Sequence, residues 1–137
     1  MKLNPDCIRA VLLEIEKSQT YYVNEEGEVT KTFLTLDSIH GSLPKFGKED
    51  IYYTLFNLEQ AGYINLSTKW AGGAVYLCTV NHMTFAGHEF LDKIRDGKRW
   101  SVIKTGLSAV ANYSLAAMNT IAEGATAGAV SAYLENL

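Results

Sequence analysis

Positive charge is scarce in this sequence of 137 residues, which has 12 lysines and arginines against 15 aspartates and glutamates. The net charge of -3 at pH 7 provides no general field that attracts a polyanion, which argues against nonspecific binding of nucleic acid. Proline is also scarce, with 2 residues, and the overall composition is that of an ordinary globular protein, not of a disordered chain. At this length we expect one domain with an appendage.

Patterns typical of catalysis or metal binding are missing as well. Cys7 and Cys78 do not suggest a disulfide framework, and the opening MKLNPDC has no apolar signal-peptide core, so we expect a cytoplasmic location. Cys78, His82 and His88 lie close in sequence, but structural zinc normally takes four ligands in paired short spacings. We find no nucleophile beside a base and no phosphate-binding glycine loop. We therefore expect no enzyme activity, no metal and no cofactor.

The sequence does contain a regular succession of helix and strand signals. Asn4 and Pro5 predict the start of a helix, and apolar residues then recur at helical spacing. The runs TYYV and VTKTF around the turn NEEGE predict a β-ribbon over about residues 20–34. Thr35 is expected to cap a short helix that ends near Leu43, and LPKFGKED forms the turn into the next helix.

The stretch DIYYTLFNLEQAGYINL combines a helix, a glycine stop and the start of a strand. We expect a helix over residues 48–61 that buries Phe56 among other apolar residues and ends at Gly62. Strands over residues 63–69 and 74–80 should then form a hairpin, because the glycines of WAGG permit a tight turn. This order predicts a mainly α fold with a small β wing, in the form of a winged helix-turn-helix.

A further helix and a different kind of segment complete the chain. Thr84 is expected to cap a helix that Gly97 ends, which places the winged-helix domain over residues 1–100. Residues 106–137 contain nine alanines, three glycines and only two charged residues, but they are too polar to predict a membrane span. Residues 101–137 are therefore expected to form helices that associate through small residues.

Parts of this sequence resemble a family of uncharacterised bacterial and phage proteins that is known only as a domain of unknown function. The opening LNPDCIRAVLLEIEK is similar to the first helix of that family. The block MTFAGHEFLDKIRDGKRW resembles its threonine, glycine-histidine, phenylalanine-leucine and final tryptophan pattern. The resemblance covers about residues 1–100 and implies a winged-helix fold and a phage or prophage setting. It brings no established activity with it.

Two functions fit the expected fold, and DNA binding or transcriptional regulation is the first. The exposed face of the recognition helix and the wing would then carry the contacts. The candidate residues for nucleic-acid binding are Lys48, Tyr53, Thr54, Asn57, Lys69 and Trp70. Three lysines against four carboxylates between residues 36 and 73 argue against this function, since a typical DNA reader places arginines there.

The alternative function is protein contact and self-association without DNA binding, with a host or phage protein as a possible partner. A long apolar stripe in the last segment should exceed what a small domain can cover, which predicts a homodimer or a higher oligomer. The residues expected at this oligomer interface are Val102, Leu107, Val110, Tyr113, Ala117 and Ile121.

Overall fold

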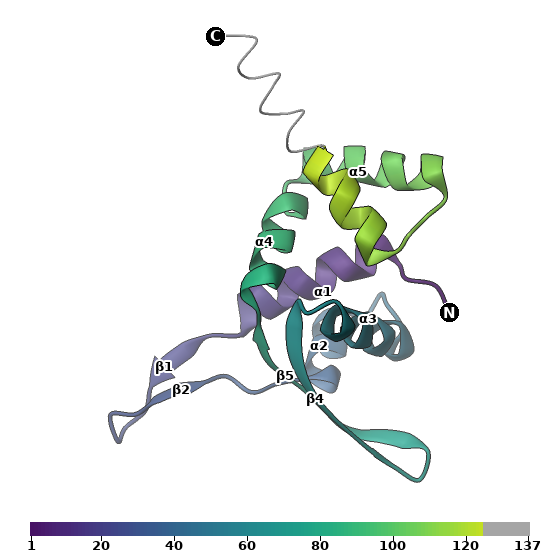
Figure 1. Ribbon diagram of the computed structural model, residues 1–137. Coiled ribbons are helices and arrows are strands. Elements are labelled where there is room, and N and C mark those ends of the chain that lie inside the picture. Colours follow the sequence, from purple (N-terminus) through teal and green to yellow (C-terminus); the bar gives the residue numbers. More distant parts are fainter. Residues whose placement is uncertain (125–137) are drawn as a thin grey trace, which may run out of the picture.

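A computed structural model of the protein describes residues 1–124 and has a mainly helical α+β fold with two small antiparallel sheets (Figure 1). The first half contains α1 (Pro5–Ser18), β1 (Tyr21–Val23), β2 (Val29–Lys31), β3 (Leu34–Thr35) and α2 (Leu36–Ser42). The second half contains α3 (Lys48–Gln60), β4 (Ile64–Ala71), β5 (Ala74–Met83), α4 (Phe85–Ile94) and α5 (Gly97–Val110). A further helix covers residues 115–124. The last part of the predicted association segment, residues 125–137, lies outside the described residues.

The two residues from which the start of α1 was predicted are also found at its N-terminus in the structure. The Asn4 side-chain oxygen accepts hydrogen bonds from the backbone N–H groups of Asp6 and Cys7, at 3.0 and 3.4 Å. Pro5 occupies the first helical position, where a missing N–H has no cost. The apolar face of α1 is completely buried and forms the centre of the core. The prediction of this helix and its cap is confirmed.

Two helices and a three-stranded sheet form the middle of the fold. Thr35 and Ser38 cap α2 reciprocally, and a turn leads from α2 into α3. The strands β4 and β5 form an antiparallel hairpin with glycines at positive φ in its turn, and β3 pairs with the other edge of β5. The predicted helix over residues 48–61 and the predicted hairpin are therefore present, with strands slightly longer than expected. The ribbon expected over residues 20–34 is also present, as β1 and β2.

The end of α4 differs from the prediction at Gly97. Thr84 does cap α4, because its hydroxyl accepts from the N–H of Gly87 at 3.1 Å. Gly97, however, is the first residue of α5 and not the stop of α4. The reason is Asp96, whose carboxylate accepts from the N–H groups of Lys98 and Arg99 and so starts a new helix.

The C-terminal helices belong to the same core as the rest of the protein. The predicted division after residue 100 falls within α5, which packs against α4, and Trp100, Ile103 and Leu107 of this helix are buried in the same core as α1 and α4. After a left-handed residue at Ala111, the helix over residues 115–124 turns back across α5 (Figure 1). Within residues 1–124, no helix combines the length and the apolar character needed to cross a membrane.

Candidate functional site

The predicted nucleic-acid-binding residues lie on α3 and on the hairpin that follows it, but Thr54 is not on the exposed face. Only 1% of Thr54 is exposed, and its hydroxyl lies 2.8 Å from the carbonyl oxygen of Asp50 and 3.4 Å from Cys7 Sγ. The prediction treated Thr54 as part of a polar stripe. Its position one turn from Ile51 and Leu58 instead places it against α1, so it cannot contact a ligand.

Two other residues of this set are occupied within the protein. The side-chain amide of Asn57 donates to the backbone carbonyl of Tyr53 at 2.8 Å, one turn earlier in α3. The ammonium of Lys48 lies 2.5 Å from the carboxylate of Asp37 on α2, so its charge is locally neutralised. The Asn57 amide has a second N–H and an oxygen besides this bond, whereas Lys48 would bring its full charge to a phosphate only by leaving Asp37.

Tyr53 lies at a separate hollow near the N-terminus. Its phenol oxygen is 3.3 Å from the carbonyl oxygen of Met1, and it lines an open hollow of about 360 Å³ together with Tyr113 and other residues. Among residues 1–124, Lys2 is the one charged side chain that lines this hollow, and these residues form no group of side chains typical of catalysis or of recognition of a charged ligand there.

Aromatic side chains gather where α3 meets the hairpin. Trp70 on β4 is 58% exposed, and its ring meets that of Tyr52 edge-on with 5.9 Å between centroids. Phe56 lies one turn after Tyr52 on the same side of α3 and is 43% exposed, whereas the sequence predicted it to be buried. The prediction failed because α1 and the sheet already fill the core side of α3 with Ile51, Leu55 and Leu58. We call Tyr52, Phe56 and Trp70 the aromatic face.

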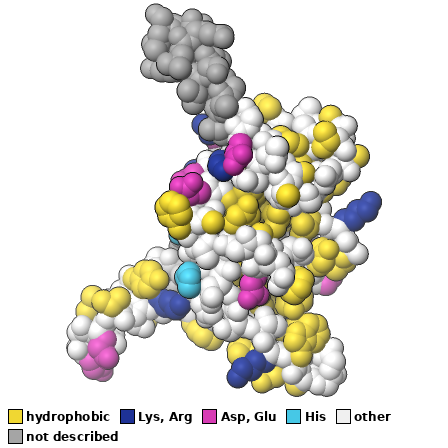
Figure 2. All heavy atoms as spheres, in the orientation of Figure 1, with side chains coloured by type: hydrophobic (Ala, Val, Ile, Leu, Met, Phe, Trp, Pro, Cys, Tyr) yellow, Lys and Arg dark blue, Asp and Glu magenta, His cyan; other side chains and the backbone are white. Residues whose placement is uncertain are grey.

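The charges around the aromatic face do not form a positive stripe. Of the three lysines in this part of the chain, Lys48 is paired with Asp37, and Lys45 lies over the ring of Phe46 at 5.0 Å from its centroid. Lys69 is exposed on β4, next to Trp70. In Figure 2 the hairpin shows mostly hydrophobic and uncharged atoms, with one basic group at its side. The surface is therefore aromatic and nearly neutral.

Two of the cations near the end of α4, Lys93 and Arg95, are paired within the protein. Arg95 donates to both oxygens of Glu16, at 2.8 and 2.7 Å, and also pairs with Asp92. Lys93 lies 3.0 Å from the carboxylate of Glu123 on the last described helix. The hydrogen bond from Arg95 lowers the pKa of Glu16 despite its partial burial. These cations hold α1, α4 and the C-terminal helix together and are not free for a polyanion.

The predicted oligomer-interface residues do not form one exposed stripe. Leu107 is completely buried within the chain, which contradicts its assignment to an interface. The helix over residues 115–124 provides the cover, since Leu115, Met118 and Ala122 join the same core. Ala117 and Ile121 are partly buried against that core, Tyr113 is only just exposed, and Val102 and Val110 are clearly exposed.

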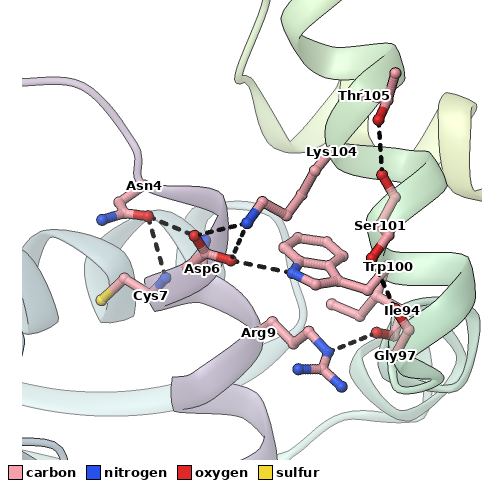
Figure 3. A network of polar contacts seen from close by, with 10 residues as sticks. All are labelled: Asn4, Asp6, Cys7, Arg9, Ile94, Gly97, Trp100, Ser101, Lys104 and Thr105. Atoms are coloured by element: carbon pink, nitrogen blue, oxygen red, sulfur yellow. Dashed lines mark hydrogen bonds and ion pairs between the residues drawn. The ribbon is translucent and has the colours of Figure 1, made fainter.

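A polar network joins the first helix to α5 (Figure 3). The indole N–H of Trp100 donates to the Asp6 carboxylate at 3.1 Å, and the ammonium of Lys104 lies 3.1 Å from the same carboxylate. Partial burial opposes ionisation of Asp6, but the bonds from Trp100 and Lys104 outweigh it and hold the pKa of this carboxyl below its ordinary value. Arg9 donates to the carbonyls of Ile94 and Arg95 and so satisfies the end of α4.

No metal-ligand cluster of three or more His, Cys, Asp or Glu side chains occurs among residues 1–124. Cys7 and Cys78 are both buried and unbridged, and burial raises the pKa of each thiol, which disfavours the reactive thiolate.

Comparisons with known proteins identify a family but no activity. The crystal structure of smu.1704 from Streptococcus mutans UA159 is similar with a TM-score of 0.45 and 20% identity, covering 81% of this chain and 92% of that chain. No curated protein sequence matches the chain. The profile of the family described as "Hypothetical protein (DUF2513)" matches residues 2–113. Since this match extends over far more than half of the chain, the protein belongs to the DUF2513 family.

Proposed function

We propose that this protein is a winged-helix module that binds another protein through the aromatic face formed by Tyr52, Phe56 and Trp70. The order of the elements supports the winged-helix assignment: α2 and α3 form a helix-turn-helix, and the β4–β5 hairpin is the wing. The small strand β3 completes the sheet on the other side of β5, as expected for a wing anchored to the domain.

The observation that carries the proposal is the exposure of Trp70 and Phe56 on a nearly neutral surface. Tryptophan and other aromatic residues are enriched at the energetic centres of protein interfaces, because they bury a large area with few rotatable bonds. The edge-on contact with Tyr52 holds the Trp70 ring in place before a partner arrives, which lowers the entropic cost of binding. A DNA-reading helix would instead present free cations.

The partner we expect has an apolar patch with a mixed polar rim. Charged side chains of both signs lie in the same part of the chain as the aromatic face: Lys45, Lys69, Glu49 and Glu59. Such a mixture is typical of the polar rim of a protein interface and does not favour a ligand with strong charge of one sign. In keeping with the phage or prophage setting that the sequence resemblance implies, we propose a host or phage protein of the cytoplasm as the partner.

DNA binding is the second candidate, and the element order favours it. In winged-helix proteins that read DNA, the helix before the wing and the wing itself approach the duplex together. Here the exposed Lys69 and Trp70 lie on the wing, and Tyr53 lies on the helix. Against this candidate stand the burial of Thr54 and the internal pairing of Lys48.

A site-specific crosslinking experiment tests the protein-binding proposal. A photo-crosslinking amino acid is placed at Trp70 or, as the matched control, at Phe85, which is exposed at the start of α4. Crosslinking in host cells should give a discrete adduct from position 70 that is lost in the presence of Phe56→Ser. Adducts of the same partner from position 85, or adducts that persist with Phe56→Ser, would contradict the aromatic face as the binding site.

A gel-shift titration against salt tests the second candidate. Binding of genomic fragments should weaken steeply as salt rises if phosphates are contacted, and Lys69→Ala should reduce the salt dependence by about one counterion. No shift at low salt excludes DNA. A salt-dependent shift that Lys69→Ala and Trp70→Ala both weaken would instead favour DNA over protein as the ligand of this surface.

A further inference from the structure

The ribbon arm, which we define as β1, β2 and the turn between them, extends from the body of the protein (Figure 1). Within the described residues this sheet has two strands, so both of its edges are free. The register places Tyr21, Val23 and Val29 on one face, together with Lys31 at the base of the arm, because Val23 pairs with Val29 and Tyr21 with Lys31. These three side chains are 68%, 66% and 73% exposed. Hydrophobic atoms line the arm in Figure 2.

Local hydrogen bonds hold the arm at its base and at its tip. At its base the hydroxyl of Thr32 donates to the carbonyl of Ser18 at 2.8 Å and accepts from the N–H of Thr20 at 3.0 Å. At its tip the Asn24 side chain accepts from the N–H groups of Glu26 and Glu28. An isolated two-stranded ribbon is marginally stable in water, so a partner that covers the apolar face would stabilise it.

The charges on the arm differ between its two ends. The tip carries Glu25, Glu26 and Glu28, all of them exposed, in three of five turn positions. The base carries Lys31, whose ammonium contacts the carbonyl of Asn81. Lys17 lies on the last turn of α1, where the neighbouring Glu16 is already paired with Arg95. One end of the arm is therefore acidic and the other is basic.

We propose that the ribbon arms of two copies of this chain pack face to face in opposite directions about a two-fold axis. In this arrangement the face of Tyr21, Val23 and Val29 covers the same face of the second copy. The opposite directions bring each acidic tip next to the basic base of the other arm, which pairs unlike charges twice. A two-fold interface requires such self-complementarity, and packing in the same direction would place like charges together.

The expected dimer is weak. A contact made mainly by two short ribbons is smaller than the roughly 1,200–2,000 Å² of a standard stable interface. The dimer should therefore dissociate on dilution and be seen in concentration-dependent sedimentation. This contact differs from the aromatic face on α3 and β4, so the dimer and the proposed function can fail separately.

Sedimentation equilibrium of the full chain over a wide concentration range provides the first test. The unaltered protein should approach dimer mass at high concentration, and Val23→Thr with Val29→Thr should weaken association at least tenfold. Threonine keeps the shape and the strand preference of valine, so the ribbon should still form. Tyr22→Thr is the matched control, because Tyr22 is exposed on the opposite face of the same arm and should leave association unchanged.

The remaining outcomes contradict the proposal. A full chain that stays monomeric at high concentration excludes the dimer. Loss of association with Val102→Thr and Val110→Thr, but not with the arm variant, would place the contact on α5. Crosslinking of the arm to a different protein by a chain that remains monomeric would assign the arm to another partner.

Charge reversal tests the direction of packing. Lys31→Glu should weaken the dimer, because the base of one arm then repels the tip of the other. Adding Lys17→Glu, Glu25→Lys and Glu26→Lys to the same chain should restore association, since the base then carries two carboxylates and the tip carries two lysines against its one remaining glutamate. Failure of this rescue, with circular dichroism showing an intact fold, would overturn the antiparallel arrangement.

Discussion

The indole N–H of Trp100 donates a hydrogen bond to the carboxylate of Asp6, a residue 94 positions earlier in the sequence. Trp100 is almost completely buried, and Asp6 lies in the first turn of α1, where a negative charge also suits the helix dipole. Lys104 pairs with the same carboxylate from one turn further along α5. Asp6 therefore links two successive turns of α5 to the N-terminus of α1.

Asp6→Ala should destabilise the protein by about 1–3 kcal/mol, because it leaves the Trp100 N–H without a partner in a partly buried place. Asp6→Asn is the matched control, since the amide oxygen can still accept from the indole while the charge facing Lys104 is lost. We expect the asparagine variant to lose less than half as much stability. Urea unfolding followed by tryptophan fluorescence measures both, and equal losses would show that the charge and not the hydrogen bond matters.

Acid should weaken the fold through Asp6 and Glu16. Both carboxyls have a folded-state pKa below the ordinary values of 3.8 and 4.5, since Asp6 gains bonds from Trp100 and Lys104 that outweigh its burial, and Glu16 gains the bond from Arg95. A lowered folded pKa gives stability that is complete above the unfolded pKa and is lost as pH falls through the folded one. Unfolding free energy should thus fall from about pH 5 downward. In Asp6→Asn with Glu16→Gln this fall should be shallower, and an unchanged pH profile would refute the assignment.

Local signals in the sequence predicted most of the secondary structure. Asn4, Thr35 and Thr84 all cap the helices that they were expected to cap, because a capping side chain acts on backbone groups only two or three residues away. The glycine pair in WAGG likewise determines a turn without any distant contact. Gly97 was misassigned because a glycine is typical of a helix end, while the neighbouring Asp96 competes as the start of the next helix.

The candidate sites depended on contacts that sequence spacing does not reveal. Thr54 has the polarity of a surface residue, and its burial follows from the position of Cys7 on a helix 47 residues away. Leu107 looked available for a partner because nothing in its own helix shows that residues 115–124 return to cover it. The exposure of Phe56 could have been predicted from the sequence, because Phe56 follows Tyr52 by four residues and this spacing places both on one side of α3.

Gly87→Ala should be strongly destabilising because α4 passes close to the backbone just before the start of β4 at this residue. A β-carbon at Gly87 would lie 2.0 Å from the carbonyl oxygen of Tyr63, and that oxygen already accepts the N–H of Thr84. The backbone cannot shift without breaking this bond, so we expect a loss of about 2–3 kcal/mol or more. Gly41→Ala on α2 is the control, since no atom lies within 4 Å of its β-carbon and alanine favours a helix. Thermal unfolding measures both, and similar stability of the two variants would contradict the close approach.

Two residues of the predicted oligomer interface, one buried and one exposed, should respond differently when their side chains are shortened to alanine. Leu107→Ala removes a completely buried side chain from the contact with the last described helix and should lower the unfolding free energy by about 2–5 kcal/mol. Val110→Ala removes an exposed side chain from the same helix, three residues later, and should change stability by less than about 0.5 kcal/mol. Urea unfolding at a concentration where the protein is monomeric measures the intramolecular effect alone. If Leu107→Ala were harmless in the monomer but abolished self-association, Leu107 would belong to an interface between copies and not to the core of each one.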